Sequence, residues 1–115
     1  MANDFKPTIG GKVLKKDAED WIKKYDDEKK DKAKDTTSCF FGRDFLEEIL
    51  RTHKEASGIS FFFCKKYSTY AGKDVLDLIL VPRKEDGTLI WPYEDGKDGN
   101  QAAYDNARLC PPTCN

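Results

Sequence analysis

The sequence predicts an α+β fold in which two helices cover one face of a four-stranded mixed sheet. Two segments carry apolar residues at helical spacing, and several short runs are rich in β-branched and aromatic residues. The expected order of elements is α-β-α-β-β-β, which packs as a two-layer sandwich. The 115 residues suit a single domain over 1–115, and such a chain can bury about 65% of its extended surface.

The first helix is expected over residues 17–33. A proline and a Gly-Gly pair make residues 1–14 an irregular lead-in, and Asp17 is placed to cap the helix. Between residues 26 and 35 the sequence is almost entirely charged, so this part is either a solvated helix or a linker. The packing face of the first helix is predicted by four apolar residues at i, i+3, i+4 and i+7: Ala18, Trp21, Ile22 and Tyr25.

A short strand and a second helix come next. Residues 36–41 are largely β-branched or aromatic, and Gly42 ends the run. Asp44 and Glu47 have the spacing of a capping box, which predicts the start of the helix. Ser57-Gly58 is its expected stop. One side of this helix carries Phe45, Leu46, Ile49, Leu50 and His53.

Three further strands are expected. Residues 59–67, with three consecutive phenylalanines, predict a strand that is buried on both faces, and residues 74–82 predict the next. Asp86-Gly87 is a hairpin signal that leads into a short strand at 88–91. These three form an antiparallel meander, whereas the first strand is parallel to its neighbour because a helix joins them. Residues 92–115 are predicted to be an ordered loop or tail.

The charge balance excludes several classes of partner. Twenty Lys and Arg residues nearly cancel 21 Asp and Glu residues, so no strong field attracts nucleic acid or an anionic membrane. The apolar stretches are too short to span a bilayer, and residues 1–6 lack an apolar signal core. We therefore expect a cytoplasmic protein, as a monomer or weak homodimer, with no nucleic acid and no membrane among its partners.

Two of the four cysteines, Cys110 and Cys114, flank a Pro-Pro pair at the carboxyl end. The prolines rule out the helix-start geometry that lowers the pKa of redox cysteines in thioredoxin-like sites. A bridge between the two needs Cα atoms about 4.4–6.8 Å apart, and therefore a sharp turn such as a cis proline or a reversal at Thr113. A structural or docking tail, a disulfide or redox pair, and a metal site are the alternatives.

No catalytic motif accompanies these cysteines. Cys39 and Cys64 lie among phenylalanines in predicted strands, where a free cysteine acts as a small hydrophobe. A zinc site needs four ligands, and only Cys39, Cys64 and His53, on predicted core elements, remain to complete one. His53 is the only histidine and lies near a helix end, where it interacts favourably with the helix dipole. We therefore predict a protein that is not an enzyme and has no cofactor or bound metal.

Aromatic residues of the predicted carboxyl-terminal loop are the candidate binding residues. Trp91, Tyr93 and Tyr104 lie beside charged groups, as aromatic residues at interaction surfaces often do. Their alternative role is to anchor a long loop to the sheet. The sequence alone favours the anchoring role.

The order of several motifs resembles a group of small bacterial proteins to which no activity is assigned. The resemblance lies in the Phe40-Phe41-Gly42 strand end, the aromatic strand after Gly58, the Asp86-Gly87 turn and the terminal Cys-Pro-Pro-x-Cys. It covers roughly residues 36–115 and implies the same strand order and a genuine tail motif. It implies no catalytic residues.

The sequence thus predicts a non-catalytic binding or protein-interaction module whose protein partner is not identified. The alternative is a thiol redox or metal-responsive protein that acts through Cys110 and Cys114.

Overall fold

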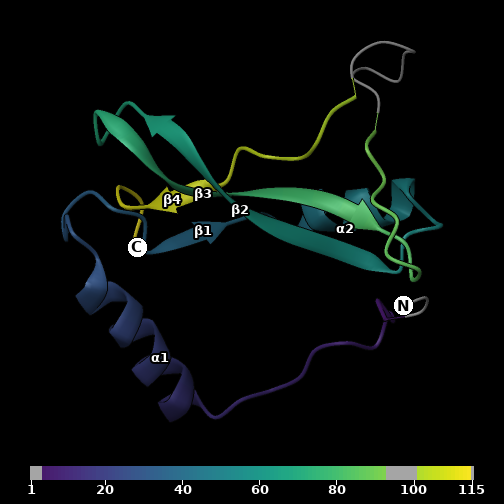
Figure 1. The fold of residues 1–115 in the computed structure, drawn as a ribbon, viewed down its shortest axis with the longest axis horizontal. Helices are drawn as coiled ribbons and strands as arrows, with labels where there is room; N and C mark the ends of the chain where they lie inside the picture. The colour runs from purple at the N-terminus through teal and green to yellow at the C-terminus, as the bar shows by residue number, and fades with distance from the viewer. Residues whose placement is uncertain (1–3, 93–100, 115) are drawn as a thin grey trace.

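The computed structural model describes residues 4–92 and 101–114, and it has the predicted α+β class (Figure 1). Within these residues it contains two helices and two separate two-stranded antiparallel sheets. In chain order the elements are α1 (Lys15–Glu28), β1 (Ser38–Phe40), α2 (Arg43–Thr52), β2 (Gly58–Ser68), β3 (Lys73–Arg83) and β4 (Arg108–Cys110).

The long hairpin of β2 and β3 is the largest element of the fold. Its register runs from Gly58 opposite Arg83 to Ser68 opposite Lys73, and Figure 1 shows the two strands as a twisted ribbon. The turn closes where the Gly72 N–H donates to the Ser68 carbonyl over 2.7 Å. Both strands extend one residue beyond the predicted ends on each side, so the hairpin is confirmed.

The second sheet differs from the predicted four-stranded mixed sheet. β1 pairs with β4 in antiparallel register, with Ser38 opposite Cys110 and Phe40 opposite Arg108. Among the described residues β1 therefore has no strand partner in β2, and the expected parallel crossover is absent. A strand of three residues has too few positions for a periodic pattern, which is why β4 could not be recognised in the tail.

The strand expected at 88–91 is reduced to one bridge. The predicted turn forms, with Gly87 at a φ of 96°, and the Ile90 N–H donates to the Pro82 carbonyl over 2.8 Å. Pro82 has no N–H with which to return that bond, so the ladder stops. Further along the same strand, Tyr104 and Leu80 exchange both backbone hydrogen bonds instead, at 2.8 and 3.0 Å.

Helix α2 begins earlier than the capping box predicts. Its N-cap is Gly42, and no side chain caps it, so Asp44 lies in the first turn. The helix ends at Thr52, and Ile49 is its buried residue. The buried hydrophobic residues of the described chain are Ile49 of α2 and three residues of β3: Val75, Leu80 and Val81.

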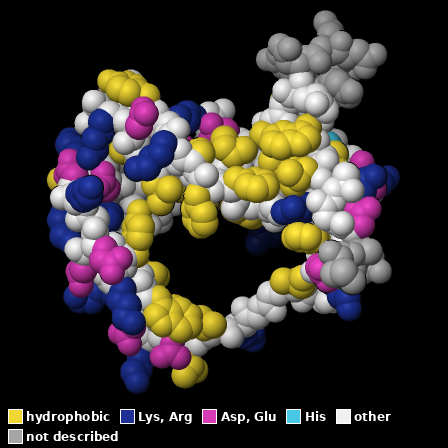
Figure 2. Space-filling model, in the orientation of Figure 1, with side chains coloured by type: hydrophobic (Ala, Val, Ile, Leu, Met, Phe, Trp, Pro, Cys, Tyr) yellow, Lys and Arg dark blue, Asp and Glu magenta, His cyan; other side chains and the backbone are white. Residues whose placement is uncertain are grey.

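Helix α1 is shorter than predicted and does not cover the sheet. It ends at Glu28 instead of residue 33, and it buries none of its residues. Trp21 and Ile22, which were predicted to form its packing face, are 55% and 58% exposed. Figure 1 shows α1 apart from the β2–β3 ribbon, and Figure 2 shows apolar side chains around the hollow beside it. α1 and α2 therefore do not form the predicted helical layer on one face of a sheet.

A buried lysine explains where α1 ends. The Lys29 ammonium group lies 2.9 Å from an Asp26 carboxylate oxygen and donates to the Thr37 hydroxyl over 2.7 Å and the Asp35 carbonyl over 3.0 Å. These bonds need the chain to turn back after Glu28 so that residues 35–37 face Lys29. The charged stretch is therefore a folded connection to β1 and not a continuation of the helix.

Much of the large apolar surface remains exposed. The three consecutive phenylalanines of β2, predicted to be buried, are accessible, and Phe63 is 79% exposed. No helix in the described part of the chain is long and apolar enough to cross a membrane.

Candidate interaction site

A cavity of about 880 Å³ opens on the outer face of the β1–β4 sheet. Three phenylalanines supply much of its apolar lining, and the carboxyl-terminal tail supplies another wall. We call it the β1–β4 cavity. Its lining residues are Ser38, Phe40, Phe41, Gly42, Phe45, Asp105, Asn106, Arg108, Thr113 and Cys114.

The register of the short sheet determines which side chains face this cavity. Residues directly opposite each other in an antiparallel pair lie on the same face. Phe40 and Arg108 therefore share the outer face, where Phe40 is 68% exposed. Cys39 lies on the inner face, and its Sγ is 3.9 Å from Oδ1 of the buried Asp77. The outer face of the sheet is thus an aromatic and cationic surface.

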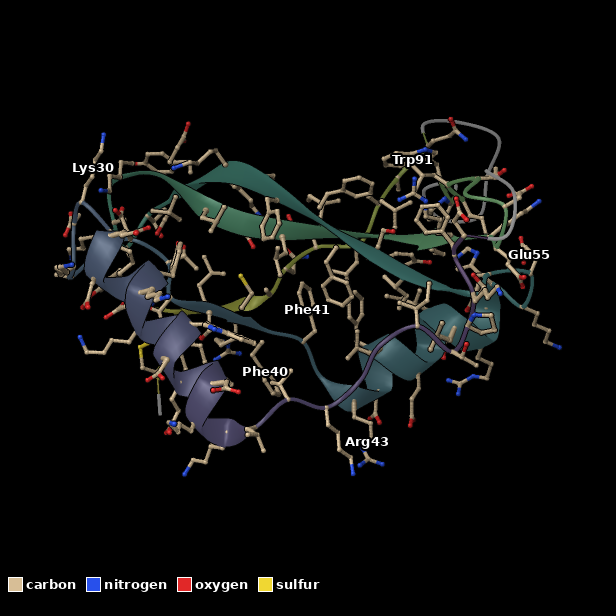
Figure 3. All side chains as sticks on the ribbon, turned by 60° about the horizontal axis from the view of Figure 1, so that its bottom comes forward. Lys30, Phe40, Phe41, Arg43, Glu55 and Trp91 are labelled. Atoms are coloured by element: carbon tan, nitrogen blue, oxygen red, sulfur yellow. A yellow bond between two sulfur atoms is a disulfide. The ribbon has the colours of Figure 1, made fainter. Side chains whose placement is uncertain are left out.

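Aromatic contacts support one wall of the cavity. The rings of Phe41 and Phe45 are stacked with their centroids 5.8 Å apart, and Phe41 meets Phe61 of β2 edge to face at 6.3 Å. Figure 3 shows Phe40 and Phe41 side by side at the end of β1, between the two helices in this view. Because α2 and β2 hold these rings from behind, the wall is built before any ligand binds.

Two polar groups of the cavity lack a partner within the described residues. The Arg108 guanidinium makes no hydrogen bond or ion pair there. Asp105 accepts a bond from the Lys66 ammonium group at Oδ2 over 2.7 Å, but its buried Oδ1 has no hydrogen-bond partner. This bond raises the pKa of Lys66, so the lysine stays charged and neutralises Asp105. Among the described residues, the cavity therefore offers one cation without a partner, Arg108, whereas Asp105 Oδ1 is buried away from the cavity space.

The tail closes the cavity through a disulfide. Cys110 and Cys114 are bonded, with their Cα atoms 4.7 Å apart, and both Cys110–Pro111 and Pro111–Pro112 are cis. The Cα separation lies within the range that a disulfide needs. The Thr113 N–H donates to the Leu109 carbonyl over 2.9 Å. Cys114 is exposed and lines the cavity, while Cys110 belongs to the strand beneath.

The other two cysteines carry free thiols on the inner side of the fold. Burial, together with the nearby Asp77 carboxylate, raises the pKa of the Cys39 thiol to about 11. Burial also raises the pKa of Cys64. Both side chains are half-buried. They are therefore less buried than the sequence predicted for cysteines that act as small hydrophobes. In the part of the chain that the structure describes, no three His, Cys, Asp or Glu side chains cluster as metal ligands.

The predicted binding aromatics are not brought together at the cavity. Trp91 is exposed but lies outside the lining, and Tyr93 lies outside the described residues. Tyr104 is half-buried, and its ring meets Phe45 edge to face at 5.7 Å, so it supports the cavity wall from behind. Of the predicted site residues, Cys114 alone is among those that line the cavity.

Sequence reasoning missed the residues that give the cavity its chemistry. Phe40 and Phe41 lie in the run predicted as a strand, and Arg108 lies in the segment predicted as an ordered loop or tail. The alternation of Ser38 and Phe40 on one face was available, but it has no meaning until β4 is known to pair with β1. Arg108 lies opposite the exposed Phe40 only because β1 and β4, which are far apart in the sequence, pair in the folded chain.

Comparison with known proteins gives no family for this chain. No protein-family model matches the sequence, no curated protein matches it, and no solved structure matches the fold.

Proposed function

We propose that this protein is a non-catalytic interaction module that binds a segment of a partner protein in the β1–β4 cavity. The observation that carries the proposal is the open aromatic wall beside Arg108, which has no partner among the described residues. Binding sites are concave, mostly apolar and equipped with a few polar groups, in volumes of about 300–1,000 Å³. Aromatic residues and arginine are also the residue types enriched at the centre of protein interfaces.

The proposed absence of catalysis is supported by what the reactive side chains do. His53, the only histidine of the chain, is buried and its Nε2 lies 2.8 Å from the Tyr104 hydroxyl. The raised pKa of Cys39 keeps its thiol neutral at physiological pH. Neither group lines the cavity, so a bound segment does not meet a general base or a thiolate from these residues.

A peptide-display selection tests the binding proposal. Random nonapeptides are selected on the immobilised protein, and the recovered pool is then offered to Phe40→Ser and Phe63→Ser variants. Both phenylalanines are strongly exposed, so neither change removes core packing. Only Phe40 lines the cavity, and we expect the pool to lose binding to Phe40→Ser while it keeps binding to Phe63→Ser. Equal retention on both variants contradicts the proposal.

A second candidate, a thiol redox role, is favoured by the position of Cys114. It is disulfide-bonded, exposed and part of the cavity lining, so a bound partner lies beside a disulfide. Stable disulfides belong to oxidising compartments, whereas a reducing cytoplasm keeps thiols reduced unless they cycle. If the protein is cytoplasmic, as we propose from the sequence, Cys110 and Cys114 are expected either to be reduced or to cycle between the thiol and disulfide forms.

Intact mass and thiol titration distinguish the two candidates. The redox role requires the Cys110–Cys114 bond to equilibrate with glutathione over the cellular range of redox potential. It also requires that serine at both positions abolish exchange with a partner thiol. Four free thiols in the native protein, with unchanged folding of the double-serine variant, exclude the redox role and leave the interaction role intact.

A further inference from the structure

We infer that the segment bound by the β1–β4 cavity is acidic, with an aspartate or glutamate next to a large apolar side chain. This inference rests on the proposed function, because it names the chemistry of the partner at the same site. It is carried by Arg108, which has no partner among the described residues, and by its position opposite Phe40 on the β1–β4 sheet.

Arg108 selects for a carboxylate. It lies opposite Phe40 on the outer face of the β1–β4 sheet and makes no ion pair with any described residue. A guanidinium presents paired N–H donors that match the two oxygens of a carboxylate, and the pair strengthens where apolar groups exclude water. An apolar side chain placed on Phe40 would exclude water from Arg108. The acidic and apolar residues of the partner segment must therefore be close neighbours.

Asp105 does not oppose this selection. Its Oδ2 is already bonded to the Lys66 ammonium group at 2.7 Å, which neutralises the carboxylate. Asp105 and Arg108 are the charged residues among the described lining residues, so with Lys66 behind Asp105 this part of the site carries a net positive charge. The other oxygen, Oδ1, is buried and presents no accessible surface to a bound segment.

A polypeptide fits these groups better than a small anion. Within the described residues β1 and β4 pair only with each other, so no third strand covers an edge of the short sheet. An extended segment can add backbone hydrogen bonds at such an edge while its side chains fill the adjoining cavity. A peptide thus offers in one chain the carboxylate for Arg108 and the apolar side chain for Phe40.

Display selection on charge-reversed variants tests the inference. The same nonapeptide library is selected in parallel on the unmodified protein, on Arg108→Glu and on Lys54→Glu. Lys54 is exposed and outside the lining, so its reversal changes the net charge equally without touching the cavity. We expect Asp or Glu beside Phe, Leu or Trp to be enriched on the unmodified protein and on Lys54→Glu. Arg108→Glu is expected to lose this enrichment and to favour Lys or Arg instead.

A change in the peptide removes any dependence on the folding of a variant. One selected peptide is synthesised with its acidic residues and again with Asn or Gln in their place, and both are titrated into the unmodified protein. We expect the amide peptide to bind about tenfold to a hundredfold more weakly, the range expected when a hydrogen bond to a charged group is lost.

The outcomes separate the inference from the function on which it rests. Peptides that need Phe40 but show no acidic preference, or amide peptides that bind equally well, overturn the inference and leave the interaction module in place. A library that yields no peptide dependent on Phe40 overturns both.

Discussion

The Tyr104 hydroxyl lies 2.8 Å from Nε2 of His53, which joins the carboxyl end of α2 to the segment that leads into β4. His53 is buried at the C-cap of α2, and the rings of the two residues meet edge to face at 5.9 Å. Tyr104 also packs against Phe45, which lines the β1–β4 cavity. This contact therefore holds the aromatic wall in place from the inner side.

Replacing Tyr104 with phenylalanine tests this contact. The change keeps the ring but removes the hydroxyl, so a buried nitrogen of His53 loses its partner. We expect the free energy of unfolding to fall by about 1–3 kcal/mol, the cost of leaving a buried polar group unsatisfied. Urea unfolding measures the loss, with Tyr67→Phe on exposed β2 surface as the matched control. Equal losses in the two variants would show that the contact contributes nothing specific.

Lys29 is expected to be the most sensitive lysine of the connection between α1 and β1. Its side chain is 3% exposed, and Lys29→Met removes three bonds while retaining most of the apolar stem. Asp26 remains half exposed and regains water, so we expect a loss of about 1–3 kcal/mol instead of the larger cost of a fully buried pair. Lys30→Met, at an exposed neighbouring position, should leave the urea midpoint nearly unchanged. A similar effect at both positions would argue against the anchoring role of Lys29.

Acid should weaken the same connection. A hydrogen bond from Lys29 lowers the pKa of Asp26, and one from Lys73 lowers the pKa of Asp35, each from an ordinary value of 3.8. Because the folded-state pKa values are depressed, this stabilisation is fully present above the ordinary value and is lost as the pH falls through the lowered values. We expect urea midpoints to decline below about pH 4, and Asp35→Asn to reduce the slope. An unchanged slope in that variant would contradict the assignment.

The thiol of Cys39 should react slowly in the folded protein. Its pKa rises from 9.0 to about 11, which lowers the thiolate fraction at pH 8 about a hundredfold, and the thiolate is the reactive form. A pulse of iodoacetamide followed by peptide mass spectrometry should label Cys39 at least that much more slowly in the native protein than in urea. Similar rates in both conditions would show that the thiol is not held neutral.

The described part of the fold was predictable where pairing is local. The β2–β3 hairpin joins neighbouring segments, and strong β-forming residues define both strands, so its ends were recognised to within one residue. The turn at Asp86-Gly87 was also evident from its residues. The strand predicted at 88–91 did not form beyond one bridge, because Pro82 lacks the N–H that a longer ladder needs.

The candidate site depends on pairing between distant segments and was therefore largely missed. β4 meets β1 across about seventy residues of chain, and nothing in residues 108–110 indicates that partner. The apolar stripe of α1 indicated a buried face, but the turn anchored by Lys29 leaves Trp21 and Ile22 exposed. The cysteine pair was evident in the sequence. The aromatic cavity that Cys114 lines was not.

Calorimetric titration of one display-selected peptide into three proteins tests the central claim most directly. The proteins are the unmodified chain, Phe40→Ser at the cavity and Phe63→Ser on exposed β2 surface. We expect binding to weaken by at least about tenfold in Phe40→Ser, as for an aromatic residue at the centre of an interface, and to stay unchanged in Phe63→Ser. Equal affinity for Phe40→Ser and the unmodified protein would contradict the assignment of the β1–β4 cavity as the binding site.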